Sequence, residues 1–146
     1  MATVSGGKKL GAILAKITAN ASNATSVEVG WRSDQTYADG TSLPLVAALN
    51  EFGRPEKNQP PRPFIRNTIA ANSKKWVEAV ESEFRRTQDA AQALGAVGDL
   101  MRSDLANSIY TFTDPPNAPS TIARKGFAAP LRDTGYMAQE IVSVVK

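Results

Sequence analysis

The segment from residue 65 to residue 109, IRNTIAANSKKWVEAVESEFRRTQDAAQALGAVGDLMRSDLANSI, decides the fold of this 146-residue chain. Its apolar residues recur at helical spacing in two blocks, within a charged background. The first block predicts a long helix that ends near residue 87, and the second predicts a helix that ends near residue 109. Gly95 and Gly98 weaken the first turns of the second helix, so the pair also fits one long bent helix. The apolar positions are Ile65, Ile69, Trp76, Val77, Val80 and Phe84, then Leu94, Val97, Met101, Leu105 and Ile109.

Proline-rich segments lie on both sides of this helical region. Residues 54–63, RPEKNQPPRP, contain four prolines in ten residues. Neither a helix nor a central strand runs through such a segment, so we predict a stiff, partly extended connection. Residues 113–119, TDPPNAP, end the helical region, and residues 120–130 are predicted to be basic, irregular and not packed on the rest of the chain.

Two further helices are predicted upstream of the first proline-rich segment. Residues 8–20 carry one apolar stripe at the spacing i, i+3, i+4 and i+7, which predicts an amphipathic helix. Residues 42–53 predict a short helix with a serine N-cap, a proline in its first turn and a terminating glycine. The stripe consists of Leu10, Ile13, Leu14 and Ile17, and the short helix is marked by Ser42, Pro44 and Gly53.

Two short strands complete the predicted fold. Residues 27–31, VEVGW, alternate between apolar and polar or small residues, and residues 141–145, IVSVV, are rich in β-branched side chains. Asp133 is predicted to cap a helix of one or two turns before the second strand. The sequence therefore predicts one α+β domain over residues 1–146, with a small, mostly antiparallel sheet packed on the long helices of residues 64–111 and with extended Pro-rich loops. Residues 1–24 form its N-terminal helix and linker.

The chain contains no histidine and no cysteine, which excludes several classes of site. It cannot form a Ser-His-Asp or Cys-His nucleophile, nor a zinc site with nitrogen and sulfur ligands. The remaining residue types leave carboxylate-based hydrolases, lysine-based chemistry and magnesium-dependent phosphoryl transfer open. The motifs for these are weak or missing, so we expect no enzymatic activity, no metal and no cofactor. No apolar run has the length of a signal peptide or a membrane span. Trp31 and Trp76 lie in the strand and helix patterns, so both are predicted to pack in the core rather than to bind a ligand.

Two carboxylate motifs need separate explanations. Asp133-Thr134-Gly135 is the tripeptide that carries the catalytic carboxylate of aspartic proteases, but there it follows an apolar strand. Here Arg132 precedes it and a helix-forming segment follows it, so a capping aspartate explains the same residues. Carboxylates at residues 78, 81 and 83 lie on a helix that also carries basic residues at 74, 75, 85 and 86. Glu81 and Arg85 have the i,i+4 spacing of a surface ion pair, so a magnesium site is not expected there.

The net charge of +3 is concentrated in one segment. Four basic residues between residues 54 and 66 surround a single acid, Glu56. Such a cluster can bind the phosphates of a nucleic acid or an acidic partner surface. It can also be a basic loop that is exposed to solvent and binds neither. A small basic nucleic-acid-binding module is therefore the alternative function that we carry forward. The cluster consists of Arg54, Lys57, Arg62 and Arg66.

Several segments, read in order, resemble one family, the tailed-bacteriophage neck proteins described as tail-completion or minor tail components. The first block comprises residues 27–31 (VEVGW), 37–42 (YADGTS), 47–53 (AALNEFG) and 60–66 (PPRPFIR). The second block comprises residues 115–126 (PPNAPSTIARKG) and 130–135 (PLRDTG), followed by the terminal strand. The resemblance covers about residues 25–146, and it rests on the order and spacing of the pieces. Arg132 and Tyr136 depart from the family pattern.

The resemblance implies a virion structural protein that joins or finishes the tail at the head–tail interface. Its partners would be further copies of itself, in a ring of roughly six subunits closed by rotation, and other neck, connector and tail-tube proteins. Assembly in the reducing cytoplasm of the host fits a chain without disulfides. A neck ring surrounds the path of the genomic DNA, so the family resemblance nominates residues that face the lumen or a partner. These candidates are Arg54, Lys57, Arg62, Arg66, Arg124 and Lys125.

Overall fold

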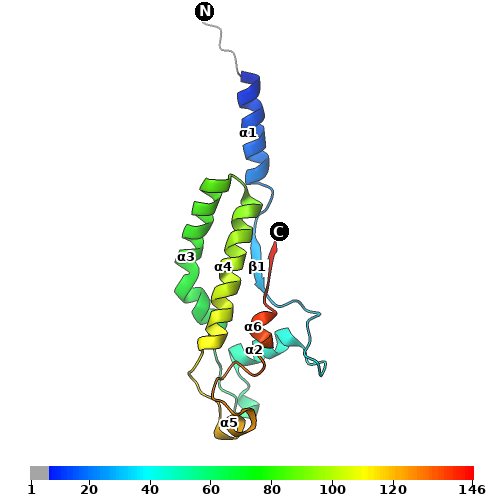
Figure 1. Ribbon diagram of the computed structural model, residues 1–146, viewed down its shortest axis with the longest axis vertical. Helices are drawn as coiled ribbons and strands as arrows, with labels where there is room; N and C mark the ends of the chain where they lie inside the picture. Colours follow the sequence, from blue (N-terminus) through cyan, green and yellow to red (C-terminus); the bar gives the residue numbers. More distant parts are fainter. Residues whose placement is uncertain (1–6) are drawn as a thin grey trace, which may run out of the picture.

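An antiparallel pair of long helices, α3 and α4, forms the body of the molecule in the computed structural model (Figure 1). The structure describes residues 7–146. No helix within these residues has the length and apolar character that crossing a membrane requires. The elements are α1 (Gly7–Ala21), β1 (Val27–Gly30), α2 (Leu43–Phe52), the 3₁₀ helix η1 (Pro55–Lys57), α3 (Phe64–Thr87), α4 (Ala90–Thr111), α5 (Pro119–Lys125), α6 (Tyr136–Gln139) and β2 (Val142–Val145).

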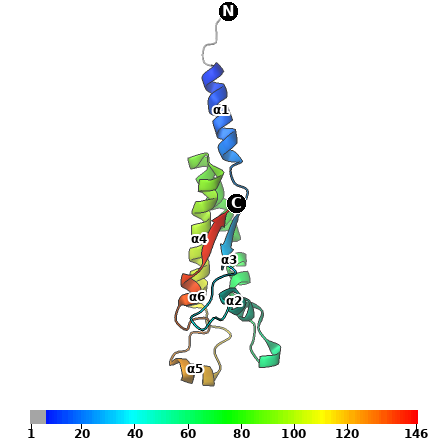
Figure 2. The same cartoon turned by 90° about the vertical axis from the view of Figure 1, so that its right-hand side faces the viewer.

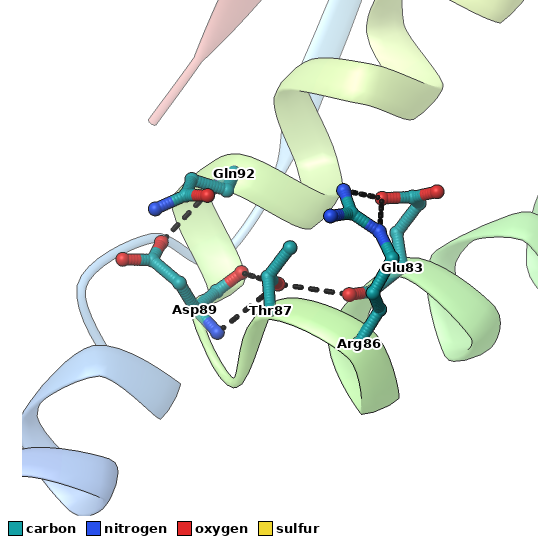
Figure 3. A network of polar contacts seen from close by, with 5 residues as sticks. All are labelled: Glu83, Arg86, Thr87, Asp89 and Gln92. Carbon is teal, nitrogen blue, oxygen red and sulfur yellow. Dashed lines mark hydrogen bonds and ion pairs between the residues drawn. The ribbon is translucent and has the colours of Figure 1, made fainter.

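A two-residue turn separates α3 from α4, so the helical region is a hairpin and not one bent helix. Gln88 ends α3 in the left-handed conformation, with φ of 56°. Asp89 then caps α4 by accepting a hydrogen bond of 2.9 Å from the backbone N–H of Gln92 (Figure 3). This bond is the main reason why the pKa of Asp89 lies below its ordinary value, and the side-chain amide of Asn23 adds to the effect. The cap therefore fixes the point at which the chain reverses.

β1 and β2 form a two-stranded antiparallel sheet that packs against α4 (Figures 1 and 2). The register pairs Val27 with Val145 and Val29 with Ser143, and these four side chains face α4 because alternate residues of a strand share a face. The helix comes close to the sheet at Gly98, where an added Cβ would lie 2.7 Å from Cγ2 of Val27. The predicted α+β class and the antiparallel pairing of the two strand segments are confirmed.

The core lies where the start of α3, the end of α4, α2 and α6 meet. Trp31, just after β1, packs edge-on against Phe64 with ring centroids 6.2 Å apart. Its indole N–H donates a hydrogen bond of 2.8 Å to the carbonyl of Met137, so both ends of the ring are held. Trp31 thus has the packing role that its strand pattern predicts. The buried core residues are Leu43, Ala47, Phe64, Leu105, Ile109, Leu131, Met137, Ala138 and Ile141.

A buried carboxylate from α2 caps the N-terminus of α3. α3 follows Pro63, which has no side-chain group to cap it. Glu51, only 2% exposed, accepts hydrogen bonds from the backbone N–H groups of Ile65 at 2.8 Å and Arg66 at 3.3 Å. Nε of the Arg66 guanidinium also lies 2.6 Å from Oε1 of Glu51 and forms an ion pair with it. A negative charge at a helix N-terminus is favourable, so α2 and α3 are locked together.

α1 extends away from the rest of the molecule in both views (Figures 1 and 2). The predicted amphipathic helix is present, but its apolar stripe is not covered. Every described side chain from residue 8 to residue 19 is exposed. The helix is therefore an appendage that, among the described helices, contacts α4 and leaves most of its apolar face open.

The structure corrects three local expectations. Residues 119–125 form α5, where irregular chain was predicted, because Pro119 starts the helix and Gly126 ends it with φ of 81°. Gly135, with φ of 84°, takes the cap position of α6, so Asp133 is not the N-cap. The proline-rich residues 54–59 close a tight loop through reciprocal backbone hydrogen bonds between Arg54 and Gln59 rather than running extended.

The close approach at Gly98 predicts opposite outcomes for two glycines of α4. Alanine normally stabilises a helix interior by roughly 1 kcal/mol over glycine. At Gly98, however, the new methyl group meets Val27 and Ser143, and overpacking of this kind costs roughly 1–3 kcal/mol. We expect Gly98→Ala to lower the free energy of unfolding in urea titrations. Gly95→Ala is the matched control, because its nearest neighbour atom would lie 3.9 Å away, and it should raise that free energy. Equal effects would contradict the packing.

Candidate interaction cavity

An open cavity of about 670 Å³ lies at the end of the molecule opposite α1. Its walls come from five parts of the chain: residues 37–41, α2, the proline-rich loop after α2, residues 116–125 with α5, and residues 130–137. Tyr37 and Tyr136 lie side by side in the wall, with ring centroids 5.4 Å apart. Burial, followed by the nearby carboxylate of Asp133, raises the pKa of Tyr37. The cavity is thus built from segments that are distant in sequence.

Basic side chains dominate the lining of this cavity. Six cations and two carboxylates line it, so its charge is strongly positive against a net charge of +3 for the whole chain. Five of the six residues predicted from the sequence are brought together here, and Arg66 is not among them. Arg132 is a sixth cation that the sequence analysis missed. The cations are Arg54, Lys57, Arg62, Arg124, Lys125 and Arg132, and the carboxylates are Asp39 and Asp133.

Arg62 is a structural residue rather than a free cation. It is 7% exposed, and its guanidinium donates hydrogen bonds to the carbonyls of Pro115 at 3.3 Å and Pro116 at 3.2 Å. It also donates to Oδ1 of Asn117 at 3.3 Å. Burial lowers the pKa of the guanidinium, which remains charged because an arginine titrates far above neutral pH. Arg62 therefore ties the proline-rich loop to residues 115–117. The side-chain amide of Asn117 in turn donates to the carbonyl of Ala129 at 3.2 Å, and Pro130 is buried, so the expectation that residues 120–130 are not packed on the rest of the chain is wrong.

Lys125 and Arg132 hold the other wall of the cavity. The ammonium of Lys125 donates to the carbonyls of Ala129, at 2.8 Å, and of Arg132. It also lies 4.9 Å from the centre of the Phe127 ring, and the Arg132 guanidinium lies 5.7 Å from the same ring. Burial is the main reason why the pKa of Lys125 is lowered. Both cations are thus partly committed to closing the loop between α5 and α6.

Lys57, Arg124 and Arg132 are the exposed cations at the cavity, and Arg132 lies against the ring of Phe127. Lys57 lies at the end of η1, and Arg124 lies in the last turn of α5. Arg54 is half-buried, and its Nε donates to Oε1 of Gln59 at 2.8 Å. Arg66 lies apart from the cavity, because it is bound to Glu51 and its guanidinium lies 5.4 Å from the ring of Phe52. Lys57 and Arg124 are therefore the best-placed groups for a ligand.

This arrangement suits recognition of an anionic surface. Exposed lysine and arginine side chains on loops attract carboxylates or phosphates, and the buried cations keep the loops in place for them. Within residues 7–146, no three His, Cys, Asp or Glu side chains gather as metal ligands would. Asp133, the candidate of the protease motif, lies exposed in this basic lining beside Lys125.

Comparisons with known proteins return no match: no family model, no curated protein and no solved structure is similar to this chain.

The role of Arg62 predicts a loss of stability when its guanidinium is removed. Arg62→Ala leaves two carbonyls and the Asn117 side chain without their donor, which costs roughly 1–3 kcal/mol. We expect a lower urea midpoint and faster tryptic cleavage within residues 113–130. Arg124→Ala, which removes an exposed cation of the same cavity, should change the free energy of unfolding by less than about 0.5 kcal/mol. Similar effects of the two substitutions would mean that Arg62 does not hold the loops together.

Proposed function

We propose that this chain is a non-enzymatic structural subunit of a tailed-bacteriophage virion. It would act as a neck or tail-completion protein that joins or terminates the tail at the head–tail interface, in a ring of copies. The ordered sequence segments that resemble this family support the proposal. The structure supports it because a single copy leaves two surfaces uncovered, the apolar stripe of α1 and the basic cavity.

The single observation that carries the proposal is the exposed apolar stripe of α1. A helix of 15 residues in water is marginal without tertiary contacts, since most helical stability in proteins comes from packing of an amphipathic face. Four large aliphatic side chains of α1 are exposed together on one side of it. An apolar stripe of this kind marks a surface that another protein covers, which is the property of an assembly subunit.

The basic cavity at the opposite end supplies a second contact surface. Lys57 and Arg124 are exposed there, on loops held by Arg62. In the proposed ring this end would meet an acidic surface of a neighbouring neck, connector or tail-tube protein. The two ends of the elongated molecule would then serve different partners (Figure 1).

The proposal predicts a defect in joining heads to tails. Phage that lack this chain should produce filled heads and separate tails, and adding the purified protein to such a lysate should restore joined, infectious particles. The measurement is the count of joined particles by electron microscopy, with plaque titre as a second readout. A variant with Asp133→Ala is the control for the protease motif and should restore joining fully. Joined particles in the absence of the chain would refute the proposal.

Binding of nucleic acid is the second candidate function, and the excess of cations at the cavity favours it. It predicts an affinity for duplex DNA that falls steeply with salt, because each phosphate contact contributes about 0.9 to the slope of log K against log salt concentration. Lys57 and Arg124 are the cations to substitute, since Arg62 and Arg66 are committed to structural contacts and the exposed Arg132 lies against the ring of Phe127. Lys57→Ala with Arg124→Ala should reduce the slope by roughly 2. The absence of measurable binding at low salt would exclude this function.

A further inference from the structure

Every described basic side chain outside α1 and the basic cavity forms an ion pair with an acid of the same chain. The pairs include Lys146 with Glu28, which lies on β1. Over most of its surface the chain therefore compensates its own positive charge. The other pairs are Arg32 with Asp34, Arg66 with Glu51, Lys74 with Glu78, Lys75 with Asp104, Arg85 with Glu81, Arg86 with Glu83 and Arg102 with Asp99.

The six cations that line the basic cavity have no such partner in the part of the chain that the structure describes. Lys57 and Arg124 are exposed, and their charged groups make neither a hydrogen bond nor an ion pair with another described residue. The exposed guanidinium of Arg132 contacts only the ring of Phe127. Uncompensated cations around one hollow attract an anionic group from another molecule.

The basic cavity is a hollow and not a flat patch. Its volume of about 670 Å³ lies within the ~300–1,000 Å³ range of cavities that hold small ligands. It therefore has room for a short segment of chain but not for a folded domain. A protein that enters this cavity must do so with a segment that protrudes from its own body.

The neutral and acidic groups of the lining suit a peptide. Burial raises the pKa of the Tyr37 phenol, so its hydroxyl stays protonated and can donate to a carbonyl or a carboxylate. The carboxylates of Asp39 and Asp133 can accept from backbone N–H groups. An acidic peptide brings carboxylates, carbonyls and N–H donors along one segment, so it can satisfy the cations, the phenol and the two carboxylates together.

DNA suits the cavity less well than a peptide. Its backbone carries a phosphate at every nucleotide and no hydrogen-bond donor, so the two lining carboxylates repel it. Single strands bind where bases stack on aromatic rings, but Tyr37 and Tyr136 pack against each other instead. Trp76 is not in the lining. Its indole N–H donates to Oδ2 of Asp104 at 2.7 Å, so it is partly buried at a surface rather than in the core.

A second copy of this chain is not the occupant, because its 146 residues contain no acidic segment that could enter. The only acidic residues that lie closer than five positions apart are Glu78, Glu81 and Glu83. All three lie on α3, and each already forms an ion pair with a basic residue of the same helix. The complementary charge must therefore come from a different protein.

We infer that the basic cavity binds a short acidic segment of a second, different protein, whose carboxylates pair with the exposed cations of the lining, above all Lys57 and Arg124. Arg62 and Lys125 are positioning residues, since they hold the loops that carry these cations. The inference rests on the proposed function for the assembly in which the partner is found. The binding itself belongs to the purified protein.

A labelled acidic peptide tests the cavity directly. The probe is a fluorescein-labelled hexapeptide of alternating aspartate and glutamate, and the control peptide has asparagine and glutamine in their place. We expect the acidic hexapeptide to bind in fluorescence anisotropy titrations at low salt, and the neutral one not to bind. No binding of the acidic hexapeptide, or equal binding of both, would overturn the inference.

Two matched double variants locate the binding. Lys57→Ala with Arg124→Ala should weaken binding of the acidic hexapeptide about tenfold, the combined effect of two exposed ion pairs. Lys16→Ala with Lys74→Ala removes the same charge from α1 and α3, so the affinity should change by less than about twofold. All four side chains are exposed, so urea titrations should show an unchanged fold. Equal losses in the two double variants would mean unspecific attraction and would overturn the inference.

An oligonucleotide separates the two kinds of anionic partner. The probe is a labelled single-stranded hexathymidylate, whose charge is close to that of the acidic hexapeptide. We expect it to bind more weakly than the hexapeptide at the same salt concentration, for the reasons given by the two carboxylates and the paired tyrosines. Tighter binding of the oligonucleotide, lost in the Lys57 and Arg124 double variant, would make the cavity a nucleic-acid site and overturn the inference.

These tests fail independently of the phage proposal. If the acidic hexapeptide binds in the cavity but phage lacking the chain still join heads to tails, the neck function is wrong and the peptide site stands. If joining requires the chain but the hexapeptide does not bind, the peptide site is wrong and the neck function stands.

Discussion

The buried carboxylate of Glu51 is the contact on which the arrangement of the remaining elements depends. A charge out of water is costly unless hydrogen-bonded partners surround it. Those partners are the first N–H groups of α3 and the side chain of Arg66, so α2 and the start of α3 must arrive together. The loop between α2 and α3 therefore has little conformational freedom. At its first residue, Gly53 has φ of 75°, and an added Cβ would lie 2.6 Å from the backbone nitrogen of Pro61. Fixing this loop fixes one wall of the basic cavity.

Much of the fold follows from local sequence signals. Helical periodicity predicted both long helices, and alternation together with β-branched residues predicted both strands, because these patterns record which face each element buries. The Ser42 cap of α2 was predicted for the same local reason, and it accepts a hydrogen bond from the N–H of Leu45. The sequence carries equally strong start and stop signals for α5, which are Pro119 and Gly126. The basic and small residues between them led to a prediction of irregular chain instead. Periodicity also predicted that α1 is amphipathic, but a single chain carries no signal for what covers it.

The candidate site was harder to predict, because tertiary contacts decide which cations are free. The proline-rich segment shows a cluster of basic residues, yet one member binds backbone carbonyls and another binds a buried carboxylate. Arg62 and Arg66 were therefore poor candidates for a partner contact, although their sequence neighbours Arg54 and Lys57 line the cavity. Arg132 joins the same cavity from far along the chain, beside the Asp-Thr-Gly tripeptide, where nothing in the sequence groups it with the basic residues. The basic lining of the cavity forms when long loops close in the tertiary structure, and a local sequence pattern does not encode it.

The pairing of β1 with β2 sets an order on the formation of the native structure. Contacts between α3 and α4 join residues that are near in sequence, so the hairpin closes a short loop. The sheet instead joins Val27 to Val145, near opposite ends of the described chain. During synthesis β2 emerges after the described helices, and until then the part of α4 that Ser143 and Val145 contact stays uncovered. The strand that completes the body is therefore the last to arrive, and the open edge of β1 is exposed to other chains until it does.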